Sequence, residues 1–179
     1  MNIENGRLAG IKIVEPKVFE DSRGSFMESY SEKILAAHGI TMNFVQDNHS
    51  TSKKGVLRGL HFQINPGQDK IVRVVSGEVF DVVVDIRISS PTFGQWESFI
   101  ISASNRVQIF IPKGFAHGFC ALTDNVEFLY KCSEYYSPVD ERGIIWNDPG
   151  LNIPWPIANP LLSDKDTKYP QLKDTPHYF

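Results

Sequence analysis

The run Val79-Phe80-Asp81-Val82-Val83-Val84-Asp85-Ile86-Arg87 decides the fold class of this chain. Successive side chains of a β-strand point to opposite faces, so the even-numbered residues, from Phe80 to Ile86, form one apolar face. The other face mixes Val79 and Val83 with charged side chains. Apolar residues on both faces predict a strand that is packed from both sides.

Similar short runs recur along the chain and predict an antiparallel β-fold. Gly, Pro, Asn and Ser separate these runs, which are rich in β-branched and aromatic residues. Only Ser31 to His38 has a helical pattern, with Ser31 as its N-cap and Gly39 as its stop. We therefore expect an all-β sandwich or barrel. The predicted strands outside 79–87 cover residues 44–46, 56–63, 71–76, 98–102, 107–111 and 126–132.

The C-terminal part of the chain has a different composition. From Pro138 onward repeated prolines predict extended surface segments, and we expect a short helix near Ser163 to Thr167. We see no linker, repeat or low-complexity tract. With 179 residues and 41% hydrophobic content, the sequence predicts one domain, residues 1–179.

Charge and hydropathy exclude several classes of partner. The net charge of −3, without a block of Lys or Arg, gives no surface for nucleic acid or anionic membrane. The N-terminus lacks the apolar stretch of a signal peptide, and no run is long enough to span a bilayer. Cys120 and Cys132 lack the spacing of a metal or redox motif, so we expect reduced packing residues. These features favour a cytoplasmic protein.

His61 lies in the run Arg58-Gly59-Leu60-His61-Phe62-Gln63. Strand alternation puts His61 on the same face as Gly59 and Gln63 and opposite to Arg58, although a bulge at Gly59 would shift that phase. This run alone leaves two interpretations open: a hydrogen-bonded structural histidine and a proton-transferring one.

Two polar runs in the N-terminal half are also ambiguous. Arg23 and Glu28 lie on a loop-to-strand element, 19–28, that by itself is an ordinary charged turn. Gln46, Asn48 and Ser50 share one strand face, which either lines a ligand cleft or, more simply, faces water.

Two runs in the C-terminal half add further candidates. His117 lies among glycines and aromatics in 111–119, which suits either close approach of a ligand to the backbone or a tight connection between strands. In 126–132 Tyr130 shares an inward apolar face with Phe128 and Cys132. An inward hydroxyl group needs a hydrogen-bond partner or a chemical role.

Taken together and in this order, these runs resemble the dTDP-4-dehydrorhamnose 3,5-epimerase family. The resemblance covers nearly the whole chain and implies a cupin-type jelly roll. The N-terminal motifs are 19–26 (Phe-x-Asp-x-Arg-Gly-x-Phe), 44–50 (Phe-x-Gln-x-Asn-x-Ser), 56–63 (Val-Leu-Arg-Gly-Leu-His-Phe-Gln) and 81–87 (Asp-Val-Val-Val-Asp-Ile-Arg). The later ones are 90–94 (Ser-Pro-Thr-Phe-Gly), 111–119 (Ile-Pro-x-Gly-Phe-Ala-His-Gly-Phe), 130–132, 135–138, 145–149 and 162–166.

The resemblance implies an epimerase that inverts C3 and C5 of dTDP-4-dehydro-6-deoxy-D-glucose, a step of dTDP-L-rhamnose biosynthesis. The C4 ketone acidifies the hydrogens on both neighbouring carbons. By resemblance His61 is the base, Asp166 orients it, and Tyr130 returns a proton from the opposite face. Lys70 stabilises the enolate oxygen. The family usually has glycine where this chain has Asp69, so the backbone or the charge beside Lys70 is expected to differ.

The resemblance also assigns residues to the nucleotide-sugar and implies a homodimer that pairs through sheet surfaces and an N-terminal segment. Arginine suits the diphosphate, and an aromatic face suits the thymine. The implied stacking residue is Tyr136. The other implied substrate-binding residues are Arg23, Phe26, Glu28, Gln46, Asn48, Arg58, His117, Glu141 and Lys165.

Three alternatives remain beside this interpretation. A metal-dependent cupin enzyme is disfavoured, because His61-Phe62-Gln63 lacks the second histidine of the usual His-x-His pair. We therefore expect neither metal nor cofactor. A non-catalytic sugar-nucleotide binding cupin would not need the implied acid and base. An epimerase of C3 alone or C5 alone would need the same base and enolate stabiliser, and the sequence does not separate it from the double epimerase.

Overall fold

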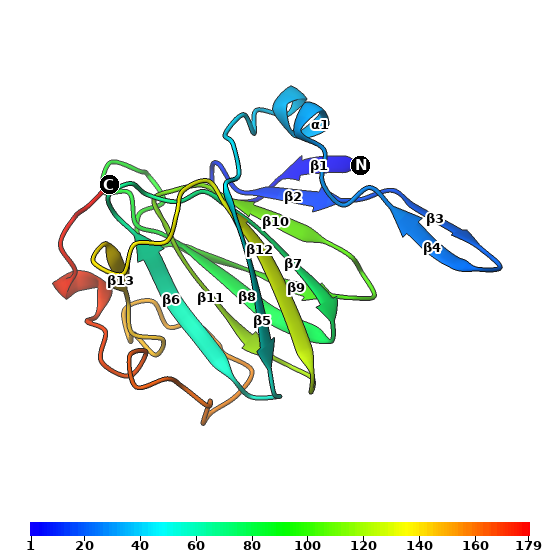
Figure 1. Cartoon of the computed structure of the whole chain (residues 1–179). Helices are drawn as coiled ribbons and strands as arrows, with labels where there is room; N and C mark the ends of the chain where they lie inside the picture. The colour runs from blue at the N-terminus through cyan, green and yellow to red at the C-terminus, as the bar shows by residue number, and fades with distance from the viewer.

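Two antiparallel sheets form the body of the structure, a computed structural model that describes residues 1–179 (Figure 1). The six-stranded sheet contains, in spatial order, β1 (Asn2–Asn5), β2 (Lys12–Glu15), β10 (Gln108–Ile111), β7 (Lys70–Ser76), β12 (Val126–Cys132) and β5 (Gln46–Ser52). The five-stranded sheet contains β13 (Glu141–Gly143), β6 (Leu57–Gln63), β11 (Phe115–Ala121), β8 (Glu78–Asp85) and β9 (Trp96–Ser102). The all-β prediction is therefore confirmed.

The order of the central strands is that of a jelly roll. One sheet has the order β5-β12-β7-β10 at its centre and one edge, and the other has β6-β11-β8-β9. From β5 to β12 the chain crosses between the sheets at every connection except the β8–β9 hairpin. This alternation of sheets is the double Greek-key arrangement implied by the resemblance.

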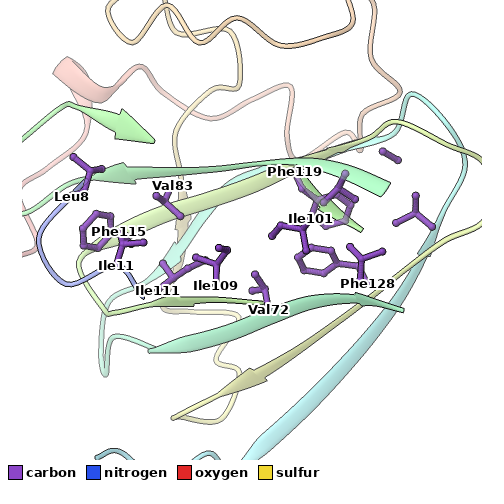
Figure 2. Close-up of a cluster of buried hydrophobic side chains, with 14 residues drawn as sticks. Leu8, Ile11, Val72, Val83, Ile101, Ile109, Ile111, Phe115, Phe119 and Phe128 are labelled. Atoms are coloured by element: carbon purple, nitrogen blue, oxygen red, sulfur yellow. The ribbon is translucent and has the colours of Figure 1, made fainter. Parts of the chain in front are cut away.

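The main core lies between the two sheets, as Figure 2 shows. Val79 and Val83 of β8 belong to it, together with Phe119 of β11 and Phe128 of β12. The opposite face of β8 contributes Val82 and Val84 to a second buried cluster. Strand β8 is thus packed on both faces, as the alternation in 79–87 predicts.

The proline-rich C-terminal segment covers the outer face of the five-stranded sheet. Leu151 is buried there, and Ile153 and Trp155 pack on the cluster that contains Val82 and Val84. The segment is extended as predicted. It does not lie wholly on the surface, because its apolar side chains pack into the second buried cluster. In Figure 1 it runs beside β6, so it can bring C-terminal residues to that strand.

Several elements differ from the sequence predictions. Strands β1, β2 and β13 were not predicted, and β5 begins at Gln46, where the predicted strand 44–46 ends. Strand β11 was not predicted, because His117 and Gly118 interrupt the apolar pattern, yet every one of its residues is buried. The predicted helix at 163–167 is wrong: hydrogen bonds from Asp166 N–H to the Ser163 carbonyl and from Lys168 N–H to the Lys165 carbonyl form successive turns. The 3-10 helix lies further on, at η1 (Leu172–Asp174).

The N-terminal region contains the predicted helix and a hairpin. Helix α1 (Glu32–Ala37) follows Ser31 and stops before Gly39, whose φ is +84°. Strands β3 (Val18–Asp21) and β4 (Gly24–Met27) form a hairpin that projects from the body of the molecule (Figure 1). No helix of this structure has both the length and the apolar character required to cross a bilayer.

Candidate active site

A cavity of about 810 Å³ opens at one end of the space between the sheets. Strands β5, β7 and β12 of one sheet and β6 and β11 of the other line it, and residues 161–166 add a further wall. The stacked rings of Phe119 and Phe128, whose centroids are 4.2 Å apart, belong to both the cavity wall and the core. They therefore separate the cavity from the core.

Most of the predicted site residues meet in this cavity. All the implied catalytic side chains line it: His61, Lys70, Tyr130 and Asp166. The substrate-binding predictions that also line it are Gln46, Asn48, Arg58, His117, Tyr136, Glu141 and Lys165. The polar row on β5, which also includes Ser50, faces this cavity and not open water.

A β-bulge at Gly59 sets the direction of the β6 side chains. His117 of β11 lies opposite His61, but Phe119 lies opposite Arg58, so β6 has one residue more than β11 between these pairs. Gly59 has a φ of +135°, and a Cβ there would lie 2.5 Å from the Cα of Gly118. The bulge brings Arg58 and His61 to the same cavity.

His61 and Asp166 form a close pair in the cavity wall. Nε2 of His61 lies 2.5 Å from Oδ1 of Asp166, whose side chain is almost fully buried. Burial alone would raise the pKa of Asp166, but the hydrogen bond and charge of His61 keep this pKa below its usual range. Asp166 therefore remains a carboxylate at neutral pH and holds the imidazole ring.

Lys70 and Tyr130 lie on neighbouring strands of the opposite sheet from His61. Neither the ammonium group of Lys70 nor the hydroxyl group of Tyr130 is within hydrogen-bond distance of another protein group, although both side chains line the cavity. Burial lowers the pKa of Lys70 and raises the pKa of Tyr130. An amine without an ionic partner in the protein and a protonated phenol thus face the same space as the imidazole.

Asp69 does not place a charge inside the cavity. Its carboxylate is buried and accepts hydrogen bonds from the backbone N–H of Lys113 (3.1 Å) and the hydroxyl group of Ser133 (3.0 Å). It is absent from the cavity wall. With aspartate in place of the family's usual glycine, the side chain of residue 69 therefore links the start of β7 to the segments of Lys113 and Ser133.

Three polar side chains at the rim of the cavity are joined by hydrogen bonds. Glu141 accepts hydrogen bonds from the hydroxyl group of Tyr136 (3.0 Å) and from Nζ of Lys165 (2.7 and 2.8 Å). Burial raises the pKa of Glu141, but hydrogen bonds from Lys165 and Tyr136 lower it more, so its pKa lies below the usual range. The exposed ring of Tyr136 is held in place at the entrance.

Two further side chains support the site and were not predicted. Oδ2 of Asp81 lies 2.8 Å from Nε2 of His117, and Oδ1 of Asp81 is buried without a partner. The carboxamide of Gln63 bonds to the carbonyl groups of Pro66 and Tyr135 and accepts from the N–H of Ser137. A charged residue within the apolar run 79–87 was the available signal for Asp81, whereas Gln63 gave none.

Three of the predicted substrate-binding residues lie outside the cavity. Arg23 and Phe26 belong to the projecting hairpin, and Glu28 follows it directly. The guanidinium of Arg23 is bound to Asp21 of the same hairpin at 2.6 Å, and the ring of Phe26 is 70% exposed. Within one chain these residues do not contribute to the site.

No three His, Cys, Asp or Glu side chains are grouped so that they could hold a metal ion. The imidazole rings of the cavity, His61 and His117, are each bound to a carboxylate. The expectation of metal-free chemistry remains a prediction.

Comparison with known proteins identifies relatives over almost the full length of the chain. The family model for dTDP-4-dehydrorhamnose 3,5-epimerase matches residues 5–174. A dTDP-4-dehydrorhamnose 3,5-epimerase from Shigella flexneri is 54% identical over 180 residues, covering 99% of each chain.

Solved structures agree with this match. A 3,5-epimerase from Legionella pneumophila in complex with dTDP-4-keto-L-rhamnose has 51% identity and a TM-score of 0.93, over 96% of this chain and 93% of that one. A 3′-monoepimerase from Streptomyces bikiniensis in complex with dTDP-quinovose has 38% identity and a TM-score of 0.88, over 93% and 86% of the chains. This chain therefore belongs to the dTDP-4-dehydrorhamnose 3,5-epimerase family.

Proposed function

We propose that this protein inverts C3 and C5 of dTDP-4-dehydro-6-deoxy-D-glucose to give dTDP-4-dehydro-L-rhamnose. One observation carries the proposal: the imidazole of His61 and the hydroxyl group of Tyr130 face one cavity from opposite sheets. Inversion requires that a proton leave one face of the sugar and return to the other. A base and an acid on facing walls suit this requirement.

His61 acts as the base in this proposal. Because its Nε2 is bonded to Asp166, Nδ1 is the nitrogen that accepts the proton from carbon. The carboxylate of Asp166 then stabilises the imidazolium that forms. Asp166 itself stays ionised, which its lowered pKa supports.

Lys70 and Tyr130 complete the proposed reaction. Loss of the proton next to the C4 ketone leaves negative charge on an enolate oxygen, and the unpaired ammonium of Lys70 stabilises that charge. Tyr130 then donates its proton to the carbon from the opposite side. Burial raises the pKa of Tyr130, so the phenol keeps its proton at neutral pH until the enolate takes it.

The remaining cavity residues bind the nucleotide part of the substrate. Arg58 and His117 provide donors for the diphosphate, and the ring of Tyr136 stacks on the thymine at the entrance. Gln46, Asn48, Glu141 and Lys165 complete the polar lining. The whole chain, residues 1–179, acts as one epimerase domain without metal or cofactor, in the cytoplasm.

The protein acts as a homodimer in this proposal. Arg23, Phe26 and Glu28 cannot reach the cavity of their own chain, but their hairpin projects from the body with Phe19 and Phe26 exposed. We propose that the hairpin extends over the cavity of a second copy and brings these residues to the bound nucleotide there.

Epimerisation at a single carbon is the second candidate, because a 3′-monoepimerase is among the related structures. The higher identity to 3,5-epimerases favours the double reaction. The test is incubation with dTDP-4-dehydro-6-deoxy-D-glucose in D₂O without added metal or nicotinamide. Deuterium at both C3 and C5 is expected, deuterium at one carbon supports the second candidate, and deuterium at neither carbon refutes both.

A further inference from the structure

Tyr169 follows Asp166 by three residues and packs on His61 and on Gly143 of the neighbouring strand. Its ring lies 5.6 Å from the His61 ring, centroid to centroid, with an interplanar angle of 65°. The ring is absent from the cavity wall, and the hydroxyl group lies close to Lys165 and Glu141 of the rim. We infer that Tyr169 is a positioning residue, which holds Asp166 against His61 through its contact with Gly143.

The contact with Gly143 is unusually close. A Cβ placed on Gly143 would lie only 2.5 to 2.6 Å from Cε2, Cδ2 and Cζ of the Tyr169 ring, so the ring lies directly on the glycine backbone. Gly143 belongs to β13 and is the register partner of His61 on β6. The ring therefore rests on the residue next to His61 in the sheet. Any larger side chain at position 143 would push the ring away.

The turn that carries Asp166 is attached to the sheet by backbone hydrogen bonds on either side and by one ion pair. Upstream, Leu161 joins the start of β6 through backbone hydrogen bonds with Gly55 (2.8 Å) and Leu57 (3.0 Å). Downstream, the Pro170 carbonyl accepts from the Ile145 N–H at 2.9 Å. Between these points Asp164 is exposed, and the ammonium group of Lys165 binds Glu141 of β13 at 2.7 Å. Beside this ion pair at the rim, the Tyr169 ring is the packing contact that fixes the distance between the turn and the strand carrying the base.

Proton abstraction depends strongly on this distance. A misplacement of about 1 Å at a catalytic group can lower turnover by about a hundredfold. Because Tyr169 does not line the cavity, its loss should lower kcat and leave KM nearly unchanged. Its hydroxyl group is not needed for packing on Gly143, so phenylalanine should replace it.

The test combines substitutions on both sides of the contact. Tyr169→Ala and Gly143→Ala should each lower kcat by about 10- to 100-fold with KM within about threefold of the wild type. Tyr169→Phe should stay within about twofold. When Tyr169→Ala has removed the ring, the methyl group introduced by Gly143→Ala no longer meets it. The double variant should therefore have a kcat no lower than that of Tyr169→Ala alone.

A second readout does not require turnover. The proton shared by His61 and Asp166 gives a downfield imidazole resonance in the NMR spectrum, assigned by its absence in His61→Gln. We expect this signal in wild type and Tyr169→Phe, and its loss in Tyr169→Ala and Gly143→Ala. The inference rests on the proposed function only for its kinetic part. A wild type that does not exchange deuterium would refute the proposed function but leave the NMR test of the contact valid.

Two results would overturn the inference. The first is an unchanged kcat together with an unchanged downfield resonance in Tyr169→Ala. The second is a loss of kcat in Gly143→Ala that is equally large with and without the Tyr169 ring. Thermal unfolding monitors the fold of each variant. If Tyr169→Ala does not fold, Gly143→Ala and Tyr169→Leu decide by the same two readouts, because the first keeps the tyrosine ring and the second keeps an apolar side chain at position 169.

Discussion

Nε2 of His61 and Oδ1 of Asp166 lie 2.5 Å apart, although 105 residues separate them in the chain. The jelly roll carries His61 on β6, and the C-terminal segment returns along that strand to bring Asp166 beside it. The pair therefore exists only in the folded chain, and its function can be tested separately from the rest of the site.

Asp166→Asn should lower kcat by about a hundredfold to ten-thousandfold, because the amide keeps the shape of the carboxylate but cannot stabilise the imidazolium. The affinity for dTDP should change little. Asp164→Asn is the matched control, since Asp164 lies in the same turn with an exposed side chain. Steady-state kinetics of both variants provide the measurement. A kcat within threefold of the wild type in Asp166→Asn would contradict the assigned role.

Lys70→Met should lower kcat by about 10² to 10³ because the enolate oxygen loses its cation. Lys70 has no ionic partner in the protein, so its replacement by an apolar side chain should not reduce the free energy of unfolding. Lys33→Met, an exposed change on α1, is the control. Turnover and urea unfolding check both statements. Normal turnover in Lys70→Met would remove Lys70 from the mechanism.

A mixed dimer tests whether the hairpin serves the partner's cavity. One subunit carries His61→Ala and the other Arg23→Ala, each with its own affinity tag, and the doubly tagged dimer is purified. If Arg23 acts on the partner, one complete site forms and the dimer should have about half of the wild-type activity. If Arg23 acts on its own chain, the mixed dimer should be no more active than the Arg23→Ala homodimer. A protein that remains monomeric would contradict the proposal at the outset.

Asp85 should give the protein a pH-dependent part of its stability. Burial alone would raise its pKa, but hydrogen bonds from Arg87, Ser90 and Thr92 lower the pKa to about 2 from an ordinary value of 3.8. Because the pKa of Asp85 is lower in the folded state, its ionised carboxylate stabilises the folded protein at pH values above the pKa of the unfolded chain. This contribution to the free energy of unfolding is lost as pH falls toward 2. The stability advantage of wild type over Asp85→Asn should therefore shrink by on the order of 2 kcal/mol between pH 5 and pH 2.

Urea unfolding of wild type and Asp85→Asn at a series of pH values measures this difference. Because the comparison subtracts the titration of all other carboxylates, it isolates Asp85. A difference that stays constant or grows toward acid pH would show that the Asp85 carboxylate is not held by these bonds in solution.

The sequence predicted the parts of the fold that depend on alternation. Residues 79–87 carry apolar side chains on both faces, and the structure packs both faces of β8. Strand β11 was not predicted because Gly118 interrupts its apolar pattern. The glycine is required there for the close approach to Gly59, a contact that no local pattern reveals. The short helix expected at 163–167 was wrong because the exposed polar residues there form turns.

The site was predictable in its residues and not in its arrangement. Alternation put Gln46, Asn48 and Ser50 on one face, but whether that face meets water or a cavity depends on the sheet opposite. Resemblance supplied Asp166 as the partner of His61, since spacing could not. Tyr169 had no signal at all, because its role comes from a contact with Gly143 across the fold.

Solvent exchange tests the central claim that His61 and Tyr130 serve opposite faces of one sugar. Wild type in D₂O should place deuterium at C3 and C5 of dTDP-4-dehydro-6-deoxy-D-glucose and invert both carbons. His61→Ala should do neither while still binding dTDP, and Tyr130→Phe should lose inversion more than exchange. Normal exchange and inversion in His61→Ala would contradict the account.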